Sequence, residues 1–137
     1  MSSTSSVANA TKLNVKGVHH ISFRVDDLDA SMHFYSRTLG FQPIERPGLG
    51  FRGAWLKAGD VELHLLEVPG SGATGTNPSE PTALANHLGL SVDGLGPVRS
   101  YFEQQSAPVY VRSECPSQLW VQDPDGNVVE FIDRSSC

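Results

Sequence analysis

The sequence lacks several features that mark particular classes of protein. Its 137 residues include only two cysteines, Cys115 and Cys137, which is too few for a disulfide framework and predicts free thiols in a reducing, cytoplasmic compartment. No run of about 18 apolar residues occurs, so we expect neither a membrane-spanning helix nor a membrane partner. Lysine and arginine together number 10 against 15 acidic residues, and the net charge of −5 disfavours nucleic acid as a partner.

The first residues also lack the pattern of a secretory signal, since no basic stretch precedes an apolar one. Their serine and threonine content predicts a disordered tail over residues 1–15. Residues 16–137 have the length of a single domain, and a hydrophobic content of 39% in the whole chain is sufficient for a core.

The domain consists of two similar halves. The stretch "HHISFRVDDL" parallels "NHLGLSVDGL", and His20 and His87 occupy equivalent places in them (87 − 20 = 67). Each stretch predicts a strand, followed by a helical pattern and then by three more strands. The first helix should begin after Asp26 or Asp27 and stop at Gly40. We therefore expect one module over 17–68, a flexible linker over 69–81 and a second module over 82–133.

Strand alternation separates two faces in each module, because successive side chains point to opposite sides of a sheet. The apolar positions should pack under the helix; they are Ile21, Phe23 and Val25 in the first module and Leu88, Leu90 and Val92 in the second. The opposite face carries both histidines beside small or polar neighbours, which are Ser22, Arg24, Gly89 and Ser91. A face lined in this way predicts an open cup rather than a core.

These stretches, together with "RPGLGFRGAWLKAGDVELHLLE" and "DPDGNVVEFID", resemble the vicinal oxygen chelate superfamily of glyoxalase I, bleomycin-resistance and extradiol-dioxygenase proteins. The likeness covers residues 17–133 and is greatest to compact glyoxalase I-like members. It implies an α+β fold in which two βαβββ modules form a cupped, barrel-like mixed sheet with helices outside. It also implies a homodimer with its sites near the subunit interface.

The resemblance further implies a metal site, with one ligand on the first and one on the last strand of each module. Carried onto this chain, these ligands are His20, His64, His87 and Glu130. Three imidazoles and a carboxylate suit a divalent first-row ion such as Zn, Ni, Co, Mn or Fe. Glu130 lies between two apolar residues and needs a partner there, which a metal ion would supply.

Other interpretations remain open for these residues. Either strand histidine, taken alone, is more often structural, and only the repeat favours both as ligands. His64 stands where many glyoxalases carry a carboxylate, and Glu62 and Glu67 are alternative ligands, of which only Glu62 shares the parity of His64. Arg24 lies on the cup face, where it could meet a substrate anion or form a structural ion pair.

The implied activity is that of a glyoxalase I-like lyase or isomerase acting on a small molecule, an α-hydroxycarbonyl thiol adduct, with glutathione as a possible co-substrate. The metal would chelate two adjacent oxygens, and Glu130 would move a proton between adjacent carbons. The alternatives are a thiol transferase of the fosfomycin-resistance type, an extradiol-type dioxygenase and a non-catalytic protein that sequesters a drug.

Overall fold

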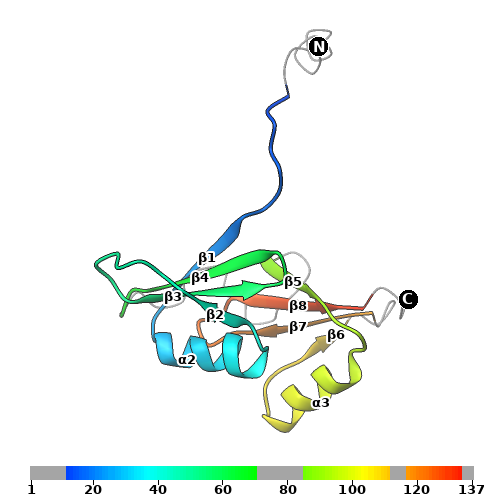
Figure 1. Cartoon of the computed structure of the whole chain (residues 1–137). Helices are drawn as coiled ribbons and strands as arrows, with labels where there is room; N and C mark the ends of the chain where they lie inside the picture. The colour runs from blue at the N-terminus through cyan, green and yellow to red at the C-terminus, as the bar shows by residue number, and fades with distance from the viewer. Residues whose placement is uncertain (1–11, 71–84, 112–116, 134–137) are drawn as a thin grey trace, which may run out of the picture.

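The computed structural model describes residues 12–70, 85–111 and 117–133. Most of the expected tail and linker and both cysteines therefore lie outside the described residues. The elements of the first module are β1 (His20–Val25), α2 (Leu28–Met32), the π-helix η1 (His33–Thr38), β2 (Gln42–Ile44), β3 (Gly53–Ala58) and β4 (Val61–Glu67) (Figure 1). Those of the second are β5 (His87–Ser91), α3 (Gly96–Gln104), β6 (Tyr110–Val111), β7 (Gln118–Gln122) and β8 (Val128–Ile132).

The two modules have the same sheet topology. The first forms a four-stranded sheet of order β1-β4-β3-β2, and the second forms one of order β5-β8-β7-β6. In both, the first strand pairs in parallel with the last, and the remaining pairs are antiparallel. The helices lie together on one side of the strands (Figure 1). The expected α+β fold of two βαβββ modules is confirmed, with cupped sheets that do not close into a barrel.

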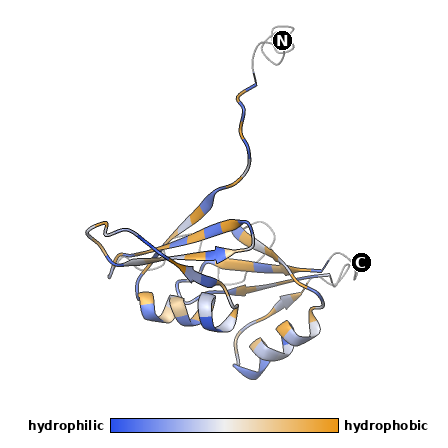
Figure 2. Ribbon diagram, in the orientation of Figure 1, coloured by the Kyte–Doolittle hydropathy of each residue, from blue (hydrophilic) through white to orange (hydrophobic). Residues whose placement is uncertain are grey.

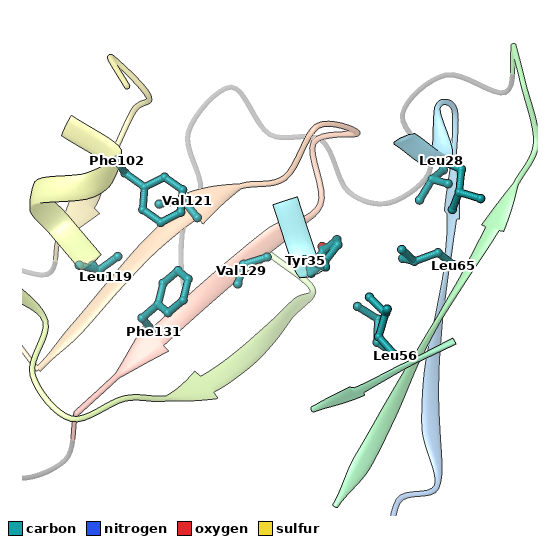
Figure 3. Packing of buried hydrophobic residues seen from close by; sticks show 11 residues of the cluster. Leu28, Tyr35, Leu56, Leu65, Phe102, Leu119, Val121, Val129 and Phe131 are labelled. Atoms are coloured by element: carbon teal, nitrogen blue, oxygen red, sulfur yellow. The ribbon is translucent and has the colours of Figure 1, made fainter. Parts of the chain in front are cut away.

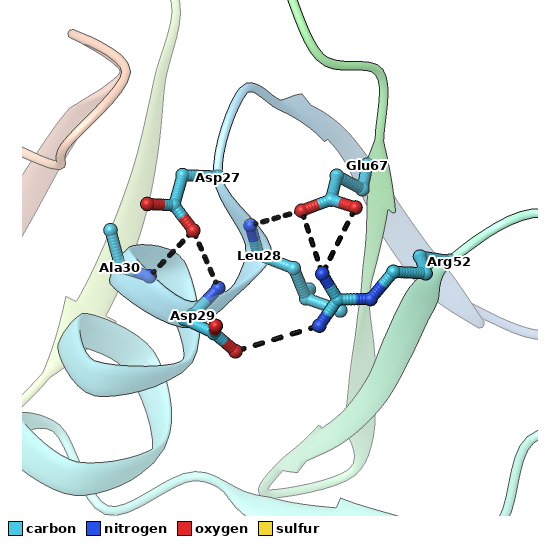
Figure 4. Close-up of polar contacts among 6 residues, drawn as sticks. All are labelled: Asp27, Leu28, Asp29, Ala30, Arg52 and Glu67. Atoms are coloured by element: carbon cyan, nitrogen blue, oxygen red, sulfur yellow. Dashed lines mark hydrogen bonds and ion pairs between the residues drawn. The ribbon is translucent and has the colours of Figure 1, made fainter.

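The first helix begins as expected, and the helical segment also stops at Gly40, which follows the C-cap Leu39 with a φ of 82°. Asp27 is its N-cap and accepts hydrogen bonds from the backbone N–H groups of Asp29 and Ala30. Glu67 accepts a further hydrogen bond from the backbone N–H of Leu28 at 2.9 Å, and its carboxylate forms an ion pair with Arg52 (Figure 4). Beyond Met32 the helix widens to the π form, which the apolar spacing did not predict.

Apolar and polar residues alternate along the strands (Figure 2), and the alternation determines the core. All the apolar positions expected under the helices belong to one buried cluster or pack against it, and the cluster contains residues of both modules. Figure 3 shows Tyr35 between the apolar side chains of the two sheets. The hydroxyl of Tyr35 donates to Asp123 Oδ2 at 2.6 Å, and this bond joins the first module's helix to the turn between β7 and β8.

Burial changes the pKa values of the two side chains that form this link. It raises the pKa of Tyr35 well above its ordinary value, with a further contribution from the negative charge of Asp123. Burial also raises the pKa of Asp123. Three bonds from the backbone and side chain of the turn support that carboxylate, two from backbone N–H groups and one from the Asn127 amide. No helix among the described residues has the length and apolar character needed to span a membrane.

Candidate metal and proton-transfer site

The first module brings His20 and His64 together on the open face of its sheet. His64 lies opposite Ser22 on β1 and opposite Trp55 on β3, and His20 lies opposite Glu62. The side chains of His20, Ser22 and Arg24 are exposed, whereas Ile21, Phe23 and Val25 between and after them are half-buried or buried. The parity predicted for this strand is therefore confirmed, because the helices cover only the apolar face.

Aromatic stacking organises these two histidines. The rings of His20 and His64 are stacked with centroids 4.0 Å apart, and the indole of Trp55 stacks on the other face of His64 at 4.3 Å. His64 Nε2 donates to Glu62 Oε1 at 2.9 Å, and this hydrogen bond is the main reason that the pKa of Glu62 lies below its ordinary value. His19 Nδ1 and His20 Nδ1 share a hydrogen bond of 2.9 Å.

The second module brings His87 and Glu130 together in a different way. His87 Nδ1 donates to the carbonyl oxygen of Ala85 at 2.6 Å, and its Nε2 lies 2.9 Å from Glu130 Oε1. The other carboxylate oxygen, Oε2, accepts a bond of 2.6 Å from Gln118 Nε2. Glu130 is only 7% exposed, and Gly89 on β5 is its register partner. An ordered carboxylate therefore stands beside a tethered imidazole.

The four predicted ligands thus form two pairs, one on each module. In the described part of a single chain, no three side chains of His, Cys, Asp or Glu gather closely enough to hold a metal ion. The prediction that His20, His64, His87 and Glu130 share one ion stays a prediction. The pairs lie on the first and last strands of the two modules, β1 with β4 and β5 with β8, and β1 and β5 each form one edge of their sheet.

The pair in the second module fits a divalent cation. A carbonyl oxygen only accepts hydrogen bonds, so Ala85 places a proton on His87 Nδ1 and directs Nε2 at the carboxylate. Two ligands bound at right angles to one ion with bonds of about 2.1 Å lie about 3 Å apart, close to the observed separation of Nε2 and Oε1. A cation between these two atoms would satisfy both.

The outer partners of the three histidines also suit metal ligation. A histidine bound to a metal usually engages its second ring nitrogen with a neighbouring group, which orients the ring. Each predicted ligand has such a partner, which is His19 for His20, Glu62 for His64 and the Ala85 carbonyl for His87. The outer partners of the donor set therefore suit the metal that the resemblance implies.

The two alternative acidic ligands, Glu62 and Glu67, have different surroundings in the structure. Glu62 lies on the open face beside His64, as its parity predicted. Glu67 instead caps the first turn of α2 and pairs with Arg52, so the structure gives it a role in the fold. Arg24 is exposed and shares the open face with His20, where the sequence placed it.

Sequence reasoning missed three groups around these donors. Gln118 and the Ala85 carbonyl were not predicted, although Gln118 begins the strand that pairs with that of Glu130. Trp55 was not predicted as part of the site either, and it stacks on His64 across the β3–β4 pair. The repeat could have indicated this contact, because Trp55 pairs with His64 across its sheet as Trp120 pairs with Glu130.

A cavity of about 560 Å³ runs along the edge strand β5 but faces the other way. Its walls include Leu90, Val92 and Phe131, which belong to or pack against the core on the helix side of the sheet. Glu130 lies on the opposite side of β8 from Phe131. This cavity is therefore separate from the donor face.

Comparison with known proteins agrees with this architecture. The sequence profile of the Glyoxalase/Bleomycin resistance protein/Dioxygenase superfamily matches residues 17–131. The chain is 33% identical to glyoxylase I 4 of Arabidopsis thaliana over 135 residues, which span 90% of this chain and 74% of that protein.

Two solved structures show the same fold. A glyoxalase/dioxygenase from Nostoc punctiforme superposes with a TM-score of 0.71 at 24% identity, covering 91% of this chain and 97% of that one. Lactoylglutathione lyase from Agrobacterium tumefaciens superposes with a TM-score of 0.59 at 21% identity, covering 87% and 94%. By its profile match, its relative and its fold, the chain belongs to the glyoxalase/bleomycin resistance protein/dioxygenase superfamily.

Proposed function

We propose that this protein is a metal-dependent lyase or isomerase of the glyoxalase I type, acting on an α-hydroxycarbonyl thiol adduct. The observation that carries the proposal is the pairing of His87 with Glu130, with each group oriented from behind by a second hydrogen bond. The superfamily and the relative at 33% identity favour the same reaction class.

The metal would be held by His20, His64, His87 and Glu130, and we expect a divalent first-row ion. When bound, such an ion stabilises negative charge on two adjacent substrate oxygens and makes the neighbouring C–H group more acidic. The ligand set carries one negative charge, so a doubly charged ion would leave the site positive. A positive site favours a substrate on which an oxyanion develops.

Glu130 is the group we assign to proton transfer. Gln118 holds Oε2, so Oε1 is the oxygen that points toward His87 and the open face. This oxygen, loosened from the metal during turnover, would take the proton from the carbon beside the carbonyl and return it to the adjacent carbon. The proton of the substrate hydroxyl would pass to the oxygen of the former carbonyl, and the enzyme ends the cycle with the protons it began with, so one carboxylate suffices for the transfer between carbons.

Substrate binding would fall to the rest of the open face. Arg24 is exposed two positions from Ser22, on the side of β1 that carries His20. A guanidinium there suits the carboxylates of a glutathione adduct, because it binds a carboxylate through two parallel hydrogen bonds. We therefore propose glutathione as the thiol of the substrate.

The complete site would form between two copies of the chain. Each chain contributes one histidine pair and one histidine–glutamate pair on faces that the helices leave uncovered. The edge strands β1 and β5 present backbone groups that another sheet could cover. A two-fold dimer would cover both edges and bring the pairs from different chains to one ion.

The test combines metal content with turnover. The purified protein is analysed for bound metal and then assayed with the hemithioacetal of methylglyoxal and glutathione after reconstitution with each candidate ion. We expect about one ion per chain, and Glu130→Gln should abolish turnover because a neutral amide cannot accept the proton. Glu62→Gln should retain activity reduced by about 10–100-fold, as for partners behind a metal ligand.

Glu103→Gln, on the exposed face of α3, is the matched control and should be unaffected. Equal loss in Glu130→Gln and Glu62→Gln would overturn the assignment of the base. A protein that retains its fold but binds no metal, and instead retains a small molecule unchanged, would replace the enzyme with a binding protein. Epoxide opening by a thiol or ring cleavage with Fe(II) would indicate one of the other reactions of the superfamily.

A further inference from the structure

Three aromatic rings lie in one stack on the open face of the first module. The Trp55 and His64 rings are 6° from parallel with centroids 4.3 Å apart, and the His64 and His20 rings are 11° from parallel with centroids 4.0 Å apart. Trp55 and His64 are direct partners across the β3–β4 pair. The backbone register therefore sets the contact between indole and imidazole.

This stack cannot bind a cation as it stands. An imidazole nitrogen binds a metal at about 2.0–2.1 Å along a lone pair that lies in the plane of the ring. Both ring planes must then pass through the ion. Two planes only 11° from parallel, in rings stacked 4.0 Å apart, do not meet within that bond length. One of the two histidines must turn when the ion binds.

The surroundings identify His20 as the ring that turns. His64 is only 7% exposed, lies between two rings and is hydrogen-bonded to Glu62. His20 is exposed, is the first residue of β1 and follows a segment without regular secondary structure. Its ring shares a hydrogen bond with the exposed His19 next to it in the chain, which can move with it.

On the basis of the function proposed above, we propose that Trp55 is a positioning residue for the metal. Its indole holds the His64 ring in place while His20 leaves the stack to complete the ligand set. The equivalent Trp120 cannot act in this way, because its register partner is Glu130, which has no ring to stack on. Cation binding should therefore change the environment of Trp55.

The two tryptophans allow a direct test. Trp120→Phe leaves Trp55 as the sole indole, and this variant is titrated with Zn²⁺ while heat and tryptophan emission are recorded in parallel. Zn²⁺ is chosen because it has no redox chemistry that would quench the indole. The emission of Trp55 should change with the same midpoint as the heat. Adding His20→Ala should weaken Zn²⁺ binding but keep the emission change, because the ion still binds the His64 ring that contacts the indole.

Zn²⁺ binding that leaves the emission of Trp55 constant would overturn the proposal, whatever the activity of the protein. If calorimetry detects no binding of Zn²⁺ by the wild-type chain, the function proposed above fails and this inference falls with it. Calorimetry thus separates the two failures.

Substitution of Trp55 gives a second, independent measurement. Trp55→Ala should weaken Zn²⁺ binding by about 10–100-fold, the usual effect of removing a group that orients a metal ligand. Trp55→Phe keeps a ring against His64 and should restore most of the affinity. Tyr101→Ala, which removes an exposed aromatic ring from α3, is the matched control. Wild-type affinity in a folded Trp55→Ala variant would contradict the assignment.

Discussion

The two modules share a topology, yet they hold their donor residues in different ways. In the first, His20 and His64 are stacked rings supported by Trp55. In the second, His87 and Glu130 face each other at 2.9 Å, each tied from behind by a hydrogen bond. The equivalent strand positions are the same, and the difference follows from one residue type, an imidazole at 64 and a carboxylate at 130.

The comparison indicates that only one half of the proposed site is ready for a cation. A carboxylate and an imidazole lying about 3 Å apart have the separation of two ligands on one ion. Stacked imidazoles do not, because their lone pairs lie in nearly parallel planes. We therefore expect the second module to provide most of the initial affinity and the first module to complete the shell. The predictions below test this difference, beginning with the largest effect.

The largest expected effect is on cation affinity. His87→Ala should weaken Zn²⁺ binding by about 100-fold or more, since even groups behind a ligand contribute about 10–100-fold. His20→Ala should lower the affinity for Zn²⁺ by only about tenfold. His20 must give up stacking on His64 worth about 1 kcal/mol when it binds the ion, and this loss offsets part of the free energy that it contributes as a ligand. Calorimetry measures both constants. A larger loss in His20→Ala than in His87→Ala would reverse the roles of the two modules.

A smaller effect concerns the bond that joins the modules. Tyr35→Phe removes the hydroxyl that donates to the buried Asp123 and should lower the free energy of unfolding by about 1–3 kcal/mol at pH 7. Chemical denaturation measures this loss. The exposed Tyr101→Phe is the matched control, and its hydroxyl makes only a contact of 3.4 Å with Thr38. Equal losses of unfolding free energy in the two variants would show that the bond between Tyr35 and Asp123 adds nothing to stability.

The same link predicts the behaviour at alkaline pH. Because the pKa of Tyr35 is raised in the folded chain, the unfolded chain loses this proton first, from about pH 10. The folded state then binds more protons than the unfolded one, so the free energy of unfolding should fall as the pH rises above that point. Tyr35→Phe should remove this part of the slope, whereas Tyr101→Phe should not.

The smallest effect concerns the helices. Asp27 caps α2 with its side chain, whereas the N-cap of α3 is Leu95, which makes no side-chain capping bond. Asp27→Ala should therefore lower the free energy of unfolding by about 1 kcal/mol. Ser100→Ala, at an exposed position within α3, should change it by less than about 0.5 kcal/mol. Thermal denaturation of both variants, compared with wild type, distinguishes a cap from a general surface substitution.

Much of the architecture could be predicted because it depends on local chemistry. Alternation of apolar and polar residues placed Ile21, Phe23 and Val25 in or against the core and left His20 and Arg24 on the open face. The repeat predicted that both modules would have one topology, and the pairing orders confirm it. The π-helical turn after Met32 was missed, because apolar spacing is similar in the two helix types.

The site was only partly predictable for a related reason. The resemblance to the superfamily identified His64 and Glu130 as candidates and their spacing agreed with it, but neither states how a ring is oriented. Gln118 and Trp55 act through contacts across strand pairs, and a pairing register is not written in any one strand. The Ala85 carbonyl is a backbone group and leaves no mark in the amino-acid pattern.

The amino-acid sequence by itself determined the duplicated fold, the face of each strand that carries the donor side chains and the residue types available to bind a cation. These follow from the period of the strand and from the preference of apolar side chains for the core. Only the tertiary structure decided that two donors would be stacked and two would face each other. Ring planes and hydrogen-bond directions depend on neighbours brought close by strand pairing, many positions away in the chain.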